Sequence, residues 1–181
     1  FEGKKISWQE ADQQVNKYAG FLKSQNINKG DCFAILMDNS PDFLMILLAS
    51  FRIGSIAALI NTTVSGEGLK HVINISNVKL ITAGASHLEK LSIALEGSDL
   101  KNLPLFSIDD EQKVPEHINN LKSLSKKFNT FEPYQPIMKD VAAYIFTSGT
   151  TGLPKAALVD HAKLVKGSFA GHFLCFNFKK E

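Results

Sequence analysis

One stretch of the chain has the residue types that could hold a polyphosphate. An apolar run ends at Thr147, and the residues that follow are Ser148-Gly149-Thr150-Thr151-Gly152-Leu153-Pro154-Lys155. Gly149 and Gly152 can take positive φ, and neither has a Cβ to keep an anion away from the backbone amides. The hydroxyl groups add hydrogen-bond donors around the turn, and Lys155 supplies a positive charge on a flexible stem. This pattern predicts a nucleotide-phosphate loop.

Two other phosphate motifs do not fit this stretch. A Walker A loop has four residues between its glycines and Lys-Ser/Thr directly after the second, whereas here two residues separate the glycines and Leu153-Pro154 precede Lys155. The pattern G-x-G-x-x-G of dinucleotide-binding folds is absent from the sequence. An ordinary Ser/Thr/Gly surface turn explains the composition, but few such turns follow a buried strand directly and end in Pro-Lys.

Residues 146–155 resemble the signature loop of the adenylate-forming enzymes, which include acyl-CoA synthetases, luciferases and the adenylation domains of peptide synthetases. Most members carry Gly after the lysine, whereas this chain has Ala156-Ala157. That variant is similar to the branch of fatty acid transport proteins and very-long-chain acyl-CoA synthetases. Residues 39–43 and 57–61 are also similar to upstream segments of that branch.

The resemblance implies an ATP-dependent acid–thiol ligase. Such an enzyme activates a fatty acid with ATP and Mg²⁺ through an acyl-adenylate and then transfers the acyl group to coenzyme A. It implies a catalytic role for Lys155 and a phosphate-binding role for Thr147, Ser148, Gly149, Thr150, Thr151, Gly152 and Lys155. Two alternatives stay open: an enzyme that adenylates another carboxylic acid, and a non-catalytic component of membrane transport or nucleotide binding.

The resemblance also bears on domain organisation. Family members are several times longer than 181 residues, so residues 1–181 are expected to be part of the large N-terminal AMP-binding domain, without the C-terminal domain. The resemblance implies that the other parts of the active site lie beyond Glu181. We therefore expect these 181 residues to be inactive alone.

Composition narrows the function classes. With 44% hydrophobic and 21% charged residues, the sequence is typical of one globular domain. A net charge of +2 and scattered basic pairs argue against a nucleic-acid partner. Cys32 and Cys175 are the only cysteines, which fits a reducing compartment, and we expect the protein in the cytoplasm or at a membrane periphery.

A protein-only metal site is not predicted. The five histidines show no ligand spacing, and the acidic triplet at residues 109–111, which could attract Mg²⁺, is typical of a solvated loop.

Hydrophobic periodicity predicts alternating strands and helices. Such alternation favours an α/β fold with a mostly parallel sheet and flanking helices. Ser7 and Glu10 form a capping-box pattern, Ser40-Pro41 begins a second helix, and Asp160 caps a last one. Strands are predicted at 32–37, 55–60, 78–82, 103–108 and 141–146; helices are predicted at 7–24, 43–51, 65–74, 87–95, 117–127 and 161–173.

Residues 43–60 are close to the length of a membrane span, with Arg52 as the sole charge. Gly54-Ser55 divides this run, and an arginine near the centre of a bilayer costs a few kcal/mol. A buried helix followed by a buried strand explains the run without that cost.

Overall fold

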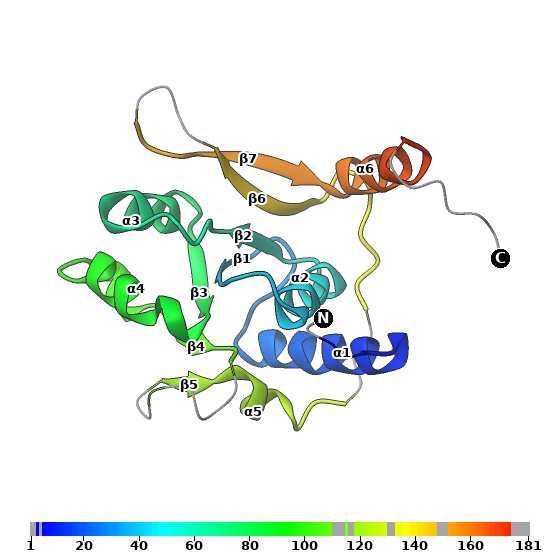
Figure 1. Cartoon of the computed structure of the whole chain (residues 1–181), viewed down its shortest axis with the longest axis horizontal. Helices are drawn as coiled ribbons and strands as arrows, with labels where there is room; N and C mark the ends of the chain where they lie inside the picture. Colours follow the sequence, from blue (N-terminus) through cyan, green and yellow to red (C-terminus); the bar gives the residue numbers. More distant parts are fainter. Residues whose placement is uncertain are drawn as a thin grey trace.

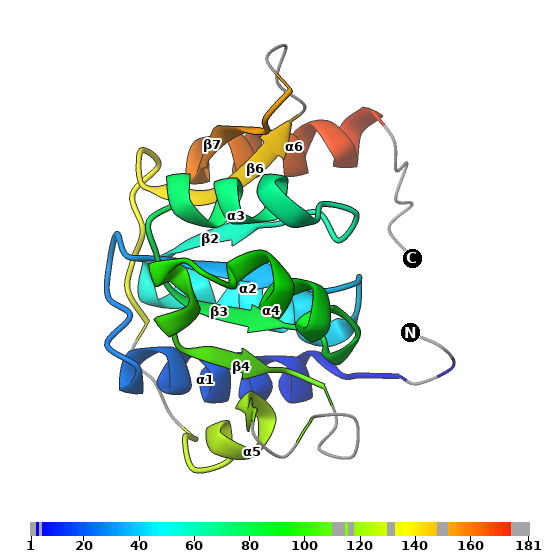
Figure 2. The same ribbon diagram turned by 90° about the vertical axis from the view of Figure 1, so that its left-hand side faces the viewer.

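The computed structural model describes residues 3, 5–109, 115, 118–129, 133–147 and 152–174, with side-chain surroundings as far as residue 167. These residues form a seven-stranded sheet with helices on both faces (Figures 1 and 2). The strands are β1 (Cys32–Leu36), β2 (Ile56–Leu59), β3 (Val78–Ala83), β4 (Leu105–Ser107), β5 (Asn119–Asn120), β6 (Val141–Thr147) and β7 (Lys155–Asp160). The helices are α1 (Trp8–Ser24), α2 (Pro41–Ile53), α3 (Gly66–Ile75), α4 (Leu88–Leu95), α5 (Leu121–Ser125) and α6 (His161–Leu174), with short 3₁₀ turns η1 (Ala85–His87) and η2 (Asp99–Asn102).

The strand order is β5-β4-β3-β1-β2-β6-β7. Neighbouring strands are parallel from β5 to β6, and only β6 and β7 are antiparallel among the described pairs. The predicted α/β class with a mostly parallel sheet is therefore confirmed. Every residue of β1 is buried, as the continuous apolar run predicted for a strand covered on both faces.

Two apolar clusters, one on each face, hold the layers together. Phe33 and Ile35 of β1 point into a cluster with α1, α2 and α5. Ala34 and Leu36, which alternate with them, point into a second cluster with α3 and α4, the two helices in front of the sheet in Figure 2. Successive side chains of one strand thus serve opposite faces, and β1 forms the centre of the protein.

Local capping sets the helix boundaries. The Ser7 hydroxyl accepts a hydrogen bond from the Glu10 amide at 3.2 Å, and the Glu10 carboxylate accepts one from the Ser7 amide at 2.7 Å. Ser40 caps α2 through the Phe43 amide at 3.1 Å, and Gly54 ends that helix at φ +71°. These caps confirm the starts of α1 and α2 predicted from sequence.

The structure differs from the predicted elements around its last strands. Lys155–Asp160 forms strand β7, which the sequence analysis did not predict, and this strand runs antiparallel to β6. The predicted helix 117–127 is shorter: strand β5 precedes α5, and His117 lies outside the described residues. The antiparallel hairpin returns the chain along β6 to the start of α6.

The apolar run at 43–60 forms most of α2 followed by β2, as predicted. In the part of the chain that the structure describes, no helix has the length and apolar character needed to cross a bilayer.

Candidate functional site

The predicted phosphate loop connects β6 to β7 at the tip of the hairpin. Thr147 ends β6, Lys155 begins β7, and the two are directly paired in the antiparallel register. Directly paired residues lie on the same face of a sheet, so the Thr147 and Lys155 side chains are neighbours. Ser148, Gly149, Thr150 and Thr151 lie outside the described residues.

The described part of the loop has the backbone that the glycine pattern predicted. Gly152 has φ +89°, and among the described residues no heavy atom lies within 4 Å of the position that a Cβ would occupy. Leu153 is 44% exposed and Lys155 is exposed, so neither side chain is committed to the core.

The two faces of the hairpin have different surroundings. Tyr144 and Phe146 pack against the cluster beneath α3 and α4. Strand alternation places Ile145, Thr147 and Lys155 on the opposite face, the one that carries α1 and α2. All three are exposed, which leaves the Lys155 ammonium in water at the hairpin tip.

The hairpin tip lies on the side of the sheet where the carboxyl ends of the parallel strands are found. In open α/β sheets, ligands bind outside the carboxyl ends of the strands. The loop after β6 is therefore on the side of the sheet where this rule expects a ligand. Thr147 and Lys155 are paired there, and Gly152 lies between them in the chain.

A histidine and an aspartate that the sequence analysis did not pair meet at the same edge. The His87 Nε2 lies 3.1 Å from Asp38 Oδ2, between the segments that follow β3 and β1. In the sheet, β2 lies on one side of β1 and β3 lies on the other, so the chain crosses from one side of β1 to the other between these strands. The two residues are 49 positions apart, so only the topology brings them together.

The acidic triplet at residues 109–111 is only partly described by the structure. Asp109 accepts a hydrogen bond from the Ala85 amide, whereas Asp110 and Glu111 lie outside the described residues. No cluster of three or more His, Cys, Asp or Glu side chains suited to a metal occurs within the described ranges.

Burial raises the pKa of the Cys32 thiol to about 12, so this group stays protonated and is no nucleophile at neutral pH.

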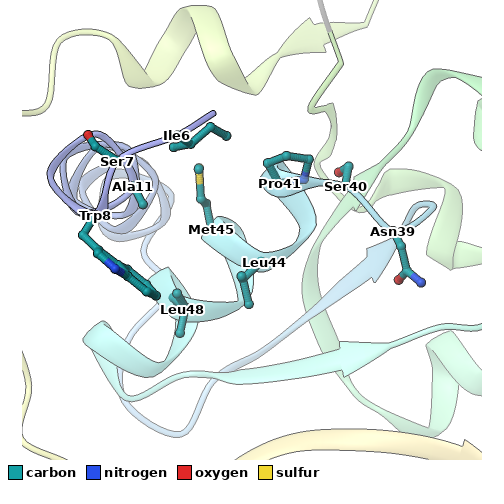
Figure 3. Close-up of a pocket in the computed structure, with 10 residues that line it drawn as sticks. All are labelled: Ile6, Ser7, Trp8, Ala11, Asn39, Ser40, Pro41, Leu44, Met45 and Leu48. Atoms are coloured by element: carbon teal, nitrogen blue, oxygen red, sulfur yellow. The ribbon is translucent and has the colours of Figure 1, made fainter. Parts of the chain in front are cut away.

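An apolar groove of about 420 Å³ lies between α1 and α2 (Figure 3). Trp8, Leu44 and Leu48 form much of its wall, and Trp8 is 91% exposed. The polar groups of its wall include the hydroxyls of Ser7 and Ser40, both already used as helix caps. The groove is lined by elements other than the phosphate loop and offers no catalytic group.

Comparison with known proteins gives one family. The family model described as AMP-binding enzyme matches residues 1–179. Long-chain fatty acid transport protein 6 of Homo sapiens is 30% identical over 178 residues, which cover 93% of this chain and 28% of that protein. The 3-hydroxybenzoate/4-hydroxybenzoate CoA ligase of Thauera aromatica is 30% identical over 161 residues, 88% of this chain and 30% of that protein. The chain thus spans less than a third of these relatives.

The fold also recurs among solved structures. ATP-bound MatB from Rhodopseudomonas palustris matches with a TM-score of 0.78 and 24% identity, over 95% of this chain and 33% of that one. At this identity the match establishes the shared fold.

Proposed function

Because the chain belongs to the AMP-binding enzyme family, we propose that the intact protein is an ATP-dependent acid–thiol ligase. Its acid is a fatty acid, activated as an acyl-adenylate, and its thiol is coenzyme A. The observation that carries the proposal is the hairpin tip. There Thr147 and Lys155 are paired at the two ends of a Gly/Ser/Thr loop, at the carboxyl ends of the parallel strands.

The chemistry explains why such a tip is useful. In the first step a carboxylate oxygen attacks the α-phosphorus of ATP, and the bond to the β-phosphate oxygen breaks, so that pyrophosphate leaves with the electron pair. Negative charge then grows on the phosphates. Loop amides, the Thr147 hydroxyl and the Lys155 ammonium would stabilise that charge and hold the leaving group in line. In the second step the sulfur of coenzyme A attacks the acyl carbon, AMP leaves, and the thiol loses its proton.

Mg²⁺ would enter with the triphosphate and neutralise part of its charge. The described residues contain no group of side chains suited to a metal, so they do not fit a site made of protein ligands alone. We assign no step to the ion. The loop residues Ser148, Gly149, Thr150 and Thr151 are proposed to hold phosphate oxygens together with Gly152 and Lys155.

The fatty acid is the finer part of the proposal. It rests on Ala156-Ala157 after the lysine and on the likeness to a long-chain fatty acid transport protein. The likeness to a hydroxybenzoate CoA ligase keeps an aryl acid as the second candidate. We place the protein in the cytoplasm or at the periphery of a membrane, and we assign residues 1–181 to the N-terminal AMP-binding domain, inactive alone.

Pyrophosphate exchange by the intact protein tests the proposal. Lys155→Ala should lower acid-dependent exchange between pyrophosphate and ATP by about 100-fold, because one preorganised charge partner of the transition state is lost. Lys166→Ala is the matched control: it removes an exposed lysine of α6 and should leave the rate unchanged. A panel of fatty and aryl acids then identifies the substrate class. Wild-type exchange in Lys155→Ala would refute the assignment.

A further inference from the structure

The base of the hairpin contains an ionic cluster outside the phosphate loop. Residues 133–140, the yellow segment of Figure 1, run up to the start of β6. The Asp140 carboxylate ends this segment and accepts hydrogen bonds from the Tyr134 hydroxyl at 2.9 Å and the Ile137 amide at 3.0 Å. The Lys29 ammonium lies 3.8 Å from its other oxygen. One carboxylate thus closes the turn within residues 133–140 and joins it to Lys29.

The backbone of the same turn holds the other end of the hairpin. The Asp140 carbonyl accepts a hydrogen bond from the His161 amide at 3.0 Å, and the Met138 carbonyl accepts one from the Ala162 amide at 3.0 Å. His161 and Ala162 begin α6 directly after β7. The beginning of β6 and the end of β7 are therefore fixed to each other at this turn.

Tyr134 connects the turn to the rest of the molecule. Its amide donates a hydrogen bond to the Arg52 carbonyl at 2.7 Å, and its ring covers Gly54 at the end of α2. The Lys29 ammonium sits 4.6 Å from the ring centroid. The backbone amide and the ring of Tyr134 thus anchor the hairpin base to α2, and the ring also contacts Lys29 in the turn before β1.

The charges favour this arrangement. The Ile137 amide, the Tyr134 hydroxyl and the positive charge of Lys29 hold the pKa of Asp140 below its ordinary value, although some desolvation opposes them. Hydrogen bonding to Tyr134 raises the pKa of Lys29, against partial desolvation, and the charge of Asp140 adds to the rise. Both groups are therefore ionised at neutral pH.

We propose that Asp140 is a positioning residue for the triphosphate loop, an inference that rests on the proposed function. Lys155 is exposed, so its place depends on the strands that carry it. The register of β6 against β2 covers only three residue pairs, from Ala57–Ala143 to Leu59–Ile145, and the β6–β7 register shifts between Val141 and Ala143. The anchored base determines the angle at which the hairpin leaves the sheet and hence where the Lys155 ammonium reaches.

Asp140→Asn in the intact protein tests this role. The amide keeps the shape but loses the charge, so the contacts with Tyr134, Ile137 and Lys29 weaken. A misplacement of 1 Å costs about 100-fold in rate, so a smaller tilt should lower kcat/KM for ATP by about 10-fold. Because the loop is also proposed to hold the phosphates of bound ATP, part of this loss should be a higher KM for ATP. The KM for the acid should not change. A purely structural role would reduce the active fraction and kcat without changing the KM for ATP.

Asp42→Asn is the matched control. The Asp42 side chain is 25% exposed against 20% for Asp140, pairs with Lys122 at 2.8 Å and accepts a hydrogen bond from the Tyr18 hydroxyl at 2.5 Å. It lies in the first turn of α2, whereas the hairpin base contacts the end of that helix, so the KM for ATP should stay at the wild-type value. Tyr134→Phe gives a second measurement if Asp140→Asn fails to fold, since it keeps the ring over Gly54 and removes only the hydroxyl; its KM for ATP should rise by a smaller factor.

The outcomes separate the two proposals. A large loss of exchange in Lys155→Ala with wild-type KM for ATP in both Asp140→Asn and Tyr134→Phe overturns the positioning role and leaves the ligase standing. Wild-type exchange in Lys155→Ala removes the ligase proposal and the positioning role with it. A higher KM for ATP in Asp42→Asn equal to that of Asp140→Asn also overturns the positioning role, because the effect would then not be specific to the hairpin base.

Discussion

The central strand β1 and the edge hairpin of β6 and β7 differ in how much of their apolar surface is covered. Phe33 and Ile35 of β1 have no exposed surface, whereas Ile145 of β6 is 45% exposed and Leu158 of β7 is 54% exposed. Helices cover both faces of β1, whereas the hairpin has exposed apolar side chains on both faces, because Leu158 pairs with Tyr144 and Ile145 lies on the opposite face. The first region therefore contributes more buried apolar surface, and the second keeps Thr147 and Lys155 exposed to solvent.

The contrast shows how one sheet can serve two purposes. Binding groups cannot be buried in the core, so the strands that carry them gain little free energy from their own apolar contacts. Their position must come from the sheet beside them and from polar anchors such as Asp140. Four substitutions, in order of decreasing effect, test whether the two regions are divided in this way.

Phe33→Ala should produce the largest loss. Removing a fully buried aromatic ring leaves a cavity, and the free energy of unfolding should fall by about 3–5 kcal/mol in urea denaturation. Ile145→Ala is the counterpart in the hairpin, where a half-exposed side chain should cost less than about 1 kcal/mol. Equal losses at the two positions would show that the hairpin is part of the stabilising core.

Gly54→Ala tests the junction between the two regions. Gly54 has φ +71°, and a Cβ there would lie 2.5 Å from the Tyr134 ring, so the free energy of unfolding should fall by about 2–4 kcal/mol. Gly30→Ala separates the two causes, because Gly30 has φ +79° with nothing within 4 Å. That control should lose only about 1 kcal/mol. If both variants lose the same amount, the Tyr134 ring yields freely and does not anchor the hairpin.

Ser7→Ala should lower the free energy of unfolding by about 1 kcal/mol, since the Glu10 amide loses its hydrogen bond to the Ser7 hydroxyl at the start of α1. Ser65→Ala at the start of α3 is the control, because the Ser65 side chain makes no capping hydrogen bond. It should shift the thermal midpoint by much less. A similar shift for both serines would mean that capping does not set the stability of α1.

Asp31→Asn should have the smallest effect and should depend on pH. Partial desolvation raises the pKa of Asp31, but the hydrogen bonds from Lys79 and the Asn28 amide outweigh it, so the folded pKa lies below the ordinary value of 3.8. The carboxylate therefore adds stability above that value, and this contribution disappears as the pH falls through the folded pKa. The pair is partly exposed, so we expect less than about 1 kcal/mol at pH 7. The difference in urea unfolding between Asp31→Asn and wild type should narrow as the pH is lowered below 3.8; a constant difference would exclude titration as the cause.

Much of the fold follows from local rules that the sequence displays. The starts of α1 and α2 follow from Ser7, Glu10, Ser40 and Pro41, because capping involves residues three or four positions apart. The central strands follow from apolar runs such as residues 32–36. Strand β7 was missed because its residues alternate only weakly, and its pairing with β6 depends on the return of the chain through the loop.

The loop motif can be recognised in the sequence because its residues are contiguous, but the contacts at the base of the hairpin cannot. Asp140, Tyr134 and Lys29 meet through segments that are far apart in the chain or that carry no regular pattern. The same holds for His87 and Asp38, which the sheet topology brings together. Contacts of this kind appear only once the strand order is known.

The exposure of Trp8 has a practical consequence, since it is the one tryptophan among the 181 residues. Its indole is 91% exposed in the folded protein, so its fluorescence emission should already resemble that of the unfolded chain. Intrinsic fluorescence would then record little of the unfolding transition, and circular dichroism is the better signal. The same residue should instead report on the α1–α2 groove, because an apolar molecule resting against Leu44 and Ile6 would shift the emission toward the blue.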